Sequence, residues 1–163
     1  MAGGAPPDDH PNAVRVAAAL AAAGIEPTIA YHEQTARTAD EAAAAVGVDV
    51  GQIVKSLIFL VDDEPVLALV SGPNRLDTGK LGALAGGRVH RADADRARAA
   101  AGYPIGGVPP LGHPAPLRTW IDGDLLQHAV VWSAAGTPHH VFPAAPSALV
   151  AATGGVVADI VVR

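Results

Sequence analysis

Two apolar runs joined by three acidic residues set the first limit on how this chain can fold. The runs are IVKSLIFLV at 53–61 and PVLALVSG at 65–72, and Asp62, Asp63 and Glu64 lie between them. Runs of this length, rich in β-branched residues and bounded by turn-forming residues, are typical of buried strands. Because three residues are enough to reverse the chain, the sequence predicts a β-hairpin over 53–72.

The segment before the hairpin predicts two helices and a strand. Asn12 precedes AVRVAAALAAAG, whose apolar residues recur at helical spacing, and Gly24 can end that helix in a left-handed conformation. Thr38 and Glu41 have the spacing of a capping box for a second helix, which Gly47 would end. Between the helices, PTIAYH alternates like a strand.

The rest of the chain continues to mix helices and strands. Asp77 and Asp93 are candidate N-caps of two short helices, and Gly102 would end the second. Farther on, LRTWID, AVVWSAAG, HHVF and VVADIVV are expected strands, and PSALVAATG an expected helix. This alternation predicts a single α+β domain over 12–163. Residues 1–11 are rich in Gly, Pro and Asp, and we expect them to be mobile.

Composition excludes several kinds of chemistry and partner. The chain has no cysteine, which rules out disulfides, thiolate metal sites and a cysteine nucleophile. Its formal net charge is -5, so it should not bind a long nucleic-acid backbone unaided. The N-terminus lacks the pattern of a secretion signal and no apolar run is long enough to span a bilayer. We therefore expect a cytoplasmic protein that does not contact a membrane.

Lys55 lies in the middle of the first apolar run. Only two of the eleven basic residues are lysines, so the chain uses arginine wherever any cation is sufficient. A compact ammonium differs from a guanidinium in size, geometry and capacity to lose a proton. Two interpretations stay open from this feature alone. Lys55 serves a site that needs a compact donor, or strand alternation simply points it at solvent.

The segment YPIGGVPPLGHPAP at 103–116 can form neither a helix nor a central strand. Its prolines remove backbone donors and fix φ, while its glycines permit conformations that other residues avoid. The result is a rigid loop whose glycine N–H groups could bind an anion or an oxyanion. The alternative is a stiff surface connection, because proline and glycine occur in most turns.

The two features together resemble a known family. The order of TADEAAAAVGV, QIVKSLIF, PVLALVSGPNRLD, GYPIGGVPPLG and WIDGDLL is similar to that in the YbaK and prolyl-tRNA synthetase-associated editing domain family. The resemblance implies one domain with a curved mixed sheet, close to a barrel, surrounded by helices. It also implies an enzyme, a free-standing aminoacyl-tRNA deacylase that hydrolyses the ester of a mischarged small amino acid on tRNA, often tRNA(Pro).

The resemblance also implies a set of site residues. The essential lysine of the family falls on Lys55, its small hydroxyl position on Ser56, and its GxxxP loop on 106–110. We expect Lys55 to hold the terminal phosphate or the ester oxygen, and N–H groups near Gly106 and Gly107 to orient the carbonyl or the attacking water. None of this chemistry needs a metal or another cofactor. The expected substrate-binding residues are Ser56, Val108, Pro110, Gly112, His113 and Asp122. Asp122, at the end of WID, could orient a substrate amino group, or it could instead cap the turn that follows the strand.

Departures from the family pattern bear on the substrate. The Cys-tRNA(Pro) deacylase branch typically has Ser-Pro where this chain has Pro109-Pro110, and basic residues where it has His113-Pro114. That branch also has Lys-Arg-Gly in a later hairpin, where this chain has Thr137-Pro138-His139. Cysteine specificity is therefore not implied, and another small amino acid fits equally well.

The histidines and the fold class suggest two further hypotheses. Adjacent His139 and His140, with His113 and His128 in the same half of the chain, suggest a metal, but neighbouring strand residues point to opposite faces and no HExxH pattern is present. A metal site is therefore not expected.

The fold could also serve as a non-catalytic module that binds the acceptor end of a tRNA or a synthetase such as prolyl-tRNA synthetase. Lys55 and the loop favour the enzyme.

Overall fold

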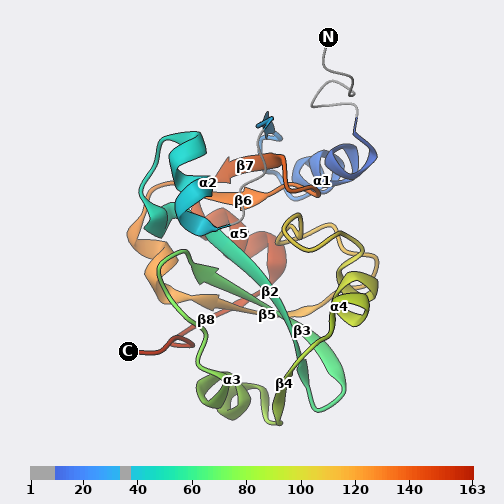
Figure 1. Ribbon diagram of the computed structural model, residues 1–163, viewed down its shortest axis with the longest axis vertical. Helices are drawn as coiled ribbons and strands as arrows, with labels where there is room; N and C mark the ends of the chain where they lie inside the picture. Colours follow the sequence, from blue (N-terminus) through green and yellow to red (C-terminus); the bar gives the residue numbers. More distant parts are fainter. Residues whose placement is uncertain (1–9, 34–37) are drawn as a thin grey trace.

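The computed structural model describes residues 10–33 and 38–163 (Figure 1). In this part of the chain the helices are α1 Pro11–Ala22, α2 Ala39–Val46, α3 Thr78–Ala85, α4 Ala94–Ala101 and α5 Pro146–Thr153, with short 3-10 helices η2 Val50–Gln52 and η3 Gly123–Gln127. The strands are β1 Ala30–Tyr31, β2 Val54–Val61, β3 Glu64–Ser71, β4 Val89–Arg91, β5 Arg118–Asp122, β6 Val131–Ala134, β7 His140–Ala144 and β8 Val156–Ala158. The expectation of a mobile N-terminus falls largely on residues 1–9, which lie outside the described part.

The strands form two sheets. One has five strands in the order β4-β2-β3-β5-β8, and the other has three in the order β1-β7-β6. The predicted hairpin is confirmed as β2 and β3, which pair antiparallel over their whole length. Because β3 pairs with β5 and β5 with β8 in parallel, the larger sheet is mixed, as expected.

The two sheets meet without closing. A single parallel bridge joins Ile53, at the start of β2, to Trp132 of β6. The described strands therefore approach the barrel that the family resemblance implied but form no closed barrel. In Figure 1, β6 and β7 lie across one end of β2, while α3 and β4 lie at the other.

The larger sheet is buried on both faces. One face packs against α1, α5 and the smaller sheet, with Leu67, Leu69 and Phe142 in its core. The other face packs against α3 and the C-terminal segment, with Val70 and Leu81 in its core. Residues directly opposite in an antiparallel pair point to the same face. Lys55 is opposite Val70 and therefore lies on the α3 face.

The helix ends follow local sequence, with one correction. Thr38 Oγ1 accepts from the Glu41 N–H at 3.1 Å and the Glu41 carboxylate accepts from the Thr38 N–H at 3.2 Å, which confirms the capping box. The prediction that Asn12 caps α1 is wrong. The helix begins at Pro11 and His10 is its N-cap, because proline suits the first helical turn and His10 Nδ1 accepts from the Asn12 N–H at 3.1 Å.

β4 is the strand that sequence patterns did not predict, and it affects the edge of the sheet. It pairs only with residues 59–61 of β2. Among the described strands, none pairs with the same edge of β2 over residues 54–58, so backbone N–H and C=O groups there face the 103–116 loop and its surroundings. The predicted strand at PTIAYH shortens to Ala30–Tyr31. No described helix is long and apolar enough to cross a membrane.

Candidate active site

Lys55 is half-buried on the α3 face of the sheet, and its amine has a definite partner. Nζ donates a hydrogen bond to the backbone carbonyl of Asn74, in the turn that follows β3. Burial lowers the pKa of the Lys55 amine from its ordinary value, and the Asp122 carboxylate partly opposes this shift. Lys55 therefore does not simply project into solvent, and the first of the two sequence interpretations fits its position.

Two cavities meet at Lys55. One has a volume of about 800 Å³ and the other about 360 Å³. The residues that line both are Lys55, Ser56 and Leu57 of β2 and Ile105, Gly106 and Val108 of the loop. The structure thus brings together the predicted lysine and the predicted loop, which are about fifty positions apart in the sequence. Ile105, which lines both cavities, is 64% exposed.

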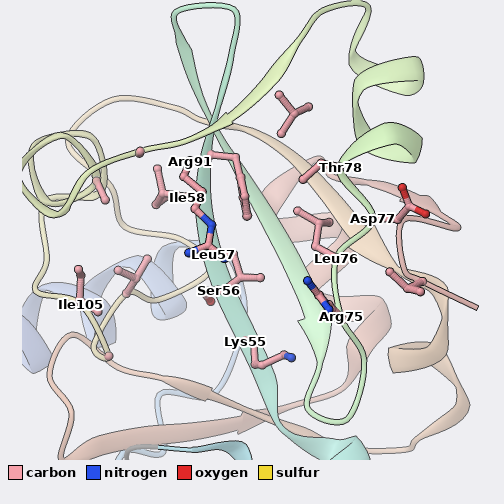
Figure 2. Close-up of a pocket in the computed structure, with 17 residues that line it drawn as sticks. Lys55, Ser56, Leu57, Ile58, Arg75, Leu76, Asp77, Thr78, Arg91 and Ile105 are labelled. Atoms are coloured by element: carbon pink, nitrogen blue, oxygen red, sulfur yellow. The ribbon is translucent and has the colours of Figure 1, made fainter.

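The larger cavity carries positive charge. Arg75, from the segment after β3, and Arg91, from β4, both line it. Both side chains are exposed, and within residues 10–33 and 38–163 neither forms an ion pair. Figure 2 shows Lys55 and Arg75 extending into the same space beside β2. Asp77 also lines this cavity, so the charge there is mixed.

The smaller cavity lies between the β2 edge, α2, the loop and the β6–β7 turn. Its polar residues include Ser133, Thr137 and His140, and Thr137 Oγ1 lies 2.5 Å from His140 Nδ1. The Ser56 and Ser133 hydroxyl groups are buried and have no hydrogen-bond partner in the described part of the chain. Among the residues that line this cavity, Lys55 is the only Lys, Arg, Asp or Glu.

The two glycines of the loop have different roles. Gly106 lines both cavities with φ at +87°, and its N–H has no hydrogen-bond partner among the described residues. Gly107 is buried, and its N–H donates to the Pro104 carbonyl at 2.9 Å. A Cβ on Gly107 would lie 2.6 Å from the Thr137 Cα. The Gly107 N–H is thus bonded within the loop, and Gly107 packs the loop against the β6–β7 turn. Its expected role in orienting substrate stays a prediction.

Four other expected substrate-binding residues line neither cavity: Pro110, Gly112, His113 and Asp122. The Gly112 carbonyl accepts from the Tyr103 hydroxyl at 2.7 Å, and His113 Nε2 is 2.8 Å from the Pro109 carbonyl oxygen. Burial lowers the pKa of His113, against the opposing effect of that backbone contact. These contacts join residues within the loop and shape that segment.

Sequence patterns missed the cationic lining of the larger cavity. Six of the eleven basic residues fall between 75 and 98, and this clustering was the one available signal. It does not identify Arg75 and Arg91, because the place of Arg91 depends on how β4 pairs with β2 and that of Arg75 on the path of the chain after β3. Among residues 10–33 and 38–163, no group of three or more His, Cys, Asp or Glu side chains is arranged to hold a metal ion.

Comparison with known proteins gives consistent results. The sequence profile of the Aminoacyl-tRNA editing domain matches residues 33–152. A proline–tRNA ligase of Nitratidesulfovibrio vulgaris strain DP4 is 36% identical over 91 residues, which cover 55% of this chain and 16% of the ligase. The chain therefore spans about a sixth of the length of that ligase.

Two further relatives match most of their own length. The Enterococcus faecalis protein EbsC, described as a candidate Cys-tRNA(Pro)/Cys-tRNA(Cys) deacylase, is 28% identical over 131 residues, covering 77% of this chain and 78% of EbsC. A crystal structure of a protein described as a candidate trans-editing enzyme for prolyl-tRNA synthetase superposes with a TM-score of 0.89 at 46% identity. That match covers 94% of this chain and 99% of the solved one.

Proposed function

Because the chain belongs to the aminoacyl-tRNA editing domain family, we propose that it is a free-standing deacylase that hydrolyses a mischarged small amino acid from tRNA(Pro). The observation that carries the proposal is the position of Lys55, where two cavities meet beside the glycine loop. The choice of tRNA(Pro) is supported by the relatives, whose names refer to prolyl-tRNA synthetase or to Cys-tRNA(Pro).

The two cavities suit the two parts of an aminoacyl-tRNA end. The larger cavity has room for a terminal nucleoside, and Arg75 and Arg91 place positive charge where phosphates would lie. The smaller cavity, lined by Ser133 and Thr137, suits a small amino acid. The ester bond that joins the two parts would then lie at Lys55, between the cavities.

The reaction consumes one water. Its oxygen joins the carbonyl carbon of the ester, the bond from that carbon to the ribose oxygen breaks, and the products are a free amino acid and a tRNA with a free ribose hydroxyl. The leaving oxygen takes one proton, and the new carboxylic acid releases another to solvent. The barrier arises from the negative charge that develops on the carbonyl oxygen, so donors aimed at that oxygen accelerate the step.

Lys55 and Gly106 supply such donors. An ammonium has three N–H groups, and Lys55 uses one on the Asn74 carbonyl. The other two can reach the ester oxygen and the terminal phosphate. The unpartnered N–H of Gly106 provides a second donor on the other wall of the same junction. A protein nucleophile is not required, because water attacks directly.

Recognition of the whole tRNA would come from elsewhere. The chain is acidic, so we expect it to contact the acceptor end only. Identity of the tRNA would then be supplied by a synthetase, such as prolyl-tRNA synthetase, bound to the same tRNA. We expect this work in the cytoplasm, where tRNA is charged and used.

The test is deacylation of tRNA(Pro) carrying alanine, serine, cysteine or proline, with two variants at Lys55. We expect at least one noncognate ester to be hydrolysed faster than Pro-tRNA(Pro). Lys55→Ala and Lys55→Arg should each lower the rate by about 10²–10³-fold, the range for loss of one oxyanion donor. Lys80→Ala is the control, because Lys80 is the other lysine, pairs with Asp159 and lines neither cavity.

The outcomes separate the enzyme from the alternative. Lys55→Ala should keep the circular dichroism spectrum and melting temperature of the parent, since a half-buried ammonium adds little stability. Near-parent turnover in that variant would remove Lys55 from the mechanism. Binding of charged tRNA without hydrolysis of any of the four esters would instead support the non-catalytic module.

A further inference from the structure

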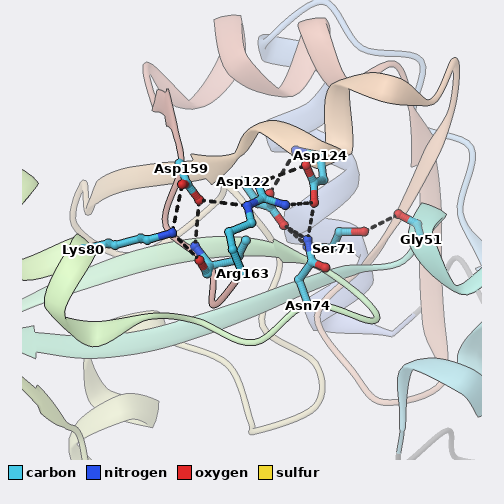
Figure 3. Close-up of polar contacts among 9 residues, drawn as sticks. Gly51, Ser71, Asn74, Lys80, Asp122, Asp124, Asp159 and Arg163 are labelled. Carbon is cyan, nitrogen blue, oxygen red and sulfur yellow. Dashed lines mark hydrogen bonds and ion pairs between the residues drawn. The ribbon is translucent and has the colours of Figure 1, made fainter.

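Lys55 is linked to a polar network at the ends of β3 and β5. Its amine donates to the backbone carbonyl of Asn74, and the Asn74 side chain donates through Nδ2 to Asp122 Oδ2 at 2.8 Å and to Asp124 Oδ2 at 2.7 Å. Arg163 Nη1 lies 2.9 Å from Asp124 Oδ2 (Figure 3). Both protons of the Asn74 amide are therefore used on carboxylates.

Asp122 is the centre of this network. It is fully buried, and its carboxylate accepts three hydrogen bonds. Oδ2 accepts from the Ser71 N–H at 3.0 Å and from Asn74 Nδ2, while Oδ1 accepts from the Asp124 N–H at 2.9 Å. Because Ser71 ends β3 and Asn74 lies three residues later, these bonds hold both ends of the turn that carries the Asn74 carbonyl.

We propose that Asn74 and Asp122 are positioning residues for catalysis: they hold the Asn74 carbonyl against the Lys55 amine and thereby direct the remaining N–H groups of Lys55 into the cavity junction. The inference rests on the proposed function, since it assigns Lys55 a catalytic position. It differs from the expectation that Asp122 orients a substrate amino group, because Asp122 lines neither cavity. Asp122 acts on Lys55 through its hydrogen bond with Asn74 and through its negative charge.

The physical reason is the flexibility of lysine. Its side chain has four rotatable bonds, and an ammonium in an open cavity samples many positions at a large entropy cost to any one of them. One fixed acceptor removes most of that freedom before the substrate arrives. Displacement of a catalytic group by about 1 Å can cost about 10²-fold in rate. We therefore expect that loss of the fixed acceptor for Lys55 lowers kcat by a measurable factor.

The pKa of Lys55 depends on the charged groups near it, so its titration reports whether Asp122 and Asn74 keep their positions. Asp122 lies within the network, Asp124 is paired with Arg163, and Arg75 and Asp77 line the larger cavity with Lys55. The Asp122 carboxylate favours the ammonium form and so raises the pKa of Lys55 against the larger effect of burial. Removing that charge leaves burial unopposed, so Lys55 should lose its proton at lower pH.

The experiment compares Asn74→Ala and Asp122→Asn with a charge-matched control. Asp63→Asn removes one carboxylate from an exposed surface pair with Arg96. In steady-state deacylation of the preferred ester we expect both network variants to lower kcat by about 10-fold or more while KM changes less than about twofold. A fall in kcat alone is expected because substrate contacts are retained and only the orientation of Lys55 is lost.

A second readout does not depend on activity. The chain has only two lysines, so labelling lysine with ¹³C at Cε gives two signals by NMR, and Lys80→Arg assigns them. In Asp122→Asn the Lys55 signal should titrate at lower pH than in the parent, and in Asn74→Ala its chemical shift should move toward that of a solvated lysine. Asp63→Asn should leave both signals and kcat unchanged.

The failures are distinguishable. If Lys55→Ala retains full activity, the proposed function fails at its first step, whatever the network does. If Lys55→Ala is inactive but both network variants match the parent in kcat and in the Lys55 titration, the positioning inference is overturned while the proposed function stands. If Asp122→Asn does not fold, Asn74→Ala, at a partly exposed position, decides the question alone.

Discussion

Gly107→Ala should impair catalysis although Gly107 lines neither cavity. The added methyl group would lie 2.6 Å from the Thr137 Cα and 2.7 Å from the Thr137 backbone nitrogen. These are main-chain atoms of the β6–β7 turn, and they cannot rotate out of the way as a side chain can. The loop and the turn must therefore separate, and Gly106 is the next residue along the loop.

The size of the effect follows from the contact distances. Ordinary van der Waals contact begins near 3.4 Å, so the gap must open by about 0.8 Å if the whole adjustment falls on this contact. A shift of that size next to Lys55 predicts a loss of kcat approaching about 10²-fold. Overpacking of a buried site should also cost about 1–3 kcal/mol of unfolding free energy. For a domain of this length each kcal/mol lowers Tm by about 2–4 °C.

The measurement is deacylation of the preferred ester together with thermal unfolding. Gly24→Ala is the control: unlike Gly107, Gly24 has a positive φ, of +77°, and no atom lies within 4 Å of its added Cβ. The control should lose about 1–2 kcal/mol from left-handed strain and keep its kcat. Parent-like kcat in Gly107→Ala, with a melting temperature no lower than that of Gly24→Ala, would refute the close packing of loop and turn.

The remaining predictions concern metals and tRNA. Deacylation should survive exhaustive chelation, because the reaction is assigned to Lys55 and backbone donors; activity lost to a chelator and restored by zinc would contradict this. Cleavage of a charged acceptor-stem minihelix should approach that of full-length tRNA with a shallow dependence on salt, because the acidic chain meets few phosphates. Arg75→Ala and Arg91→Ala should each raise KM and reduce the salt slope by about one. A steep slope, or loss of activity on truncation, would indicate an extended tRNA-binding surface.

Local sequence determined most of the elements of this fold. The capping box of α2 joins Thr38 and Glu41, which are three residues apart, and Asp77 and Asp93 cap α3 and α4 in the same way. The β2–β3 hairpin likewise depends on two apolar runs and the turn between them. Such features depend on neighbours within a few residues, so they can be read before the fold is known. Lys55 and the glycine loop stood out for the same reason, as unusual residue types in their own segments.

The tertiary structure decided what those residues can do. Asn74 and Asp122 are 48 positions apart, and they meet because β3 and β5 pair in parallel. The hydrogen-bond partner of Lys55 is a backbone carbonyl 19 residues away. Every residue has such a carbonyl, so the sequence does not indicate which one accepts this bond. Gly107 became a packing residue because the β6–β7 turn lies against it. Strand order and register determine which of these distant residues come into contact. Both result from packing the whole core, because the burial of apolar surface is non-directional and does not select particular polar contacts.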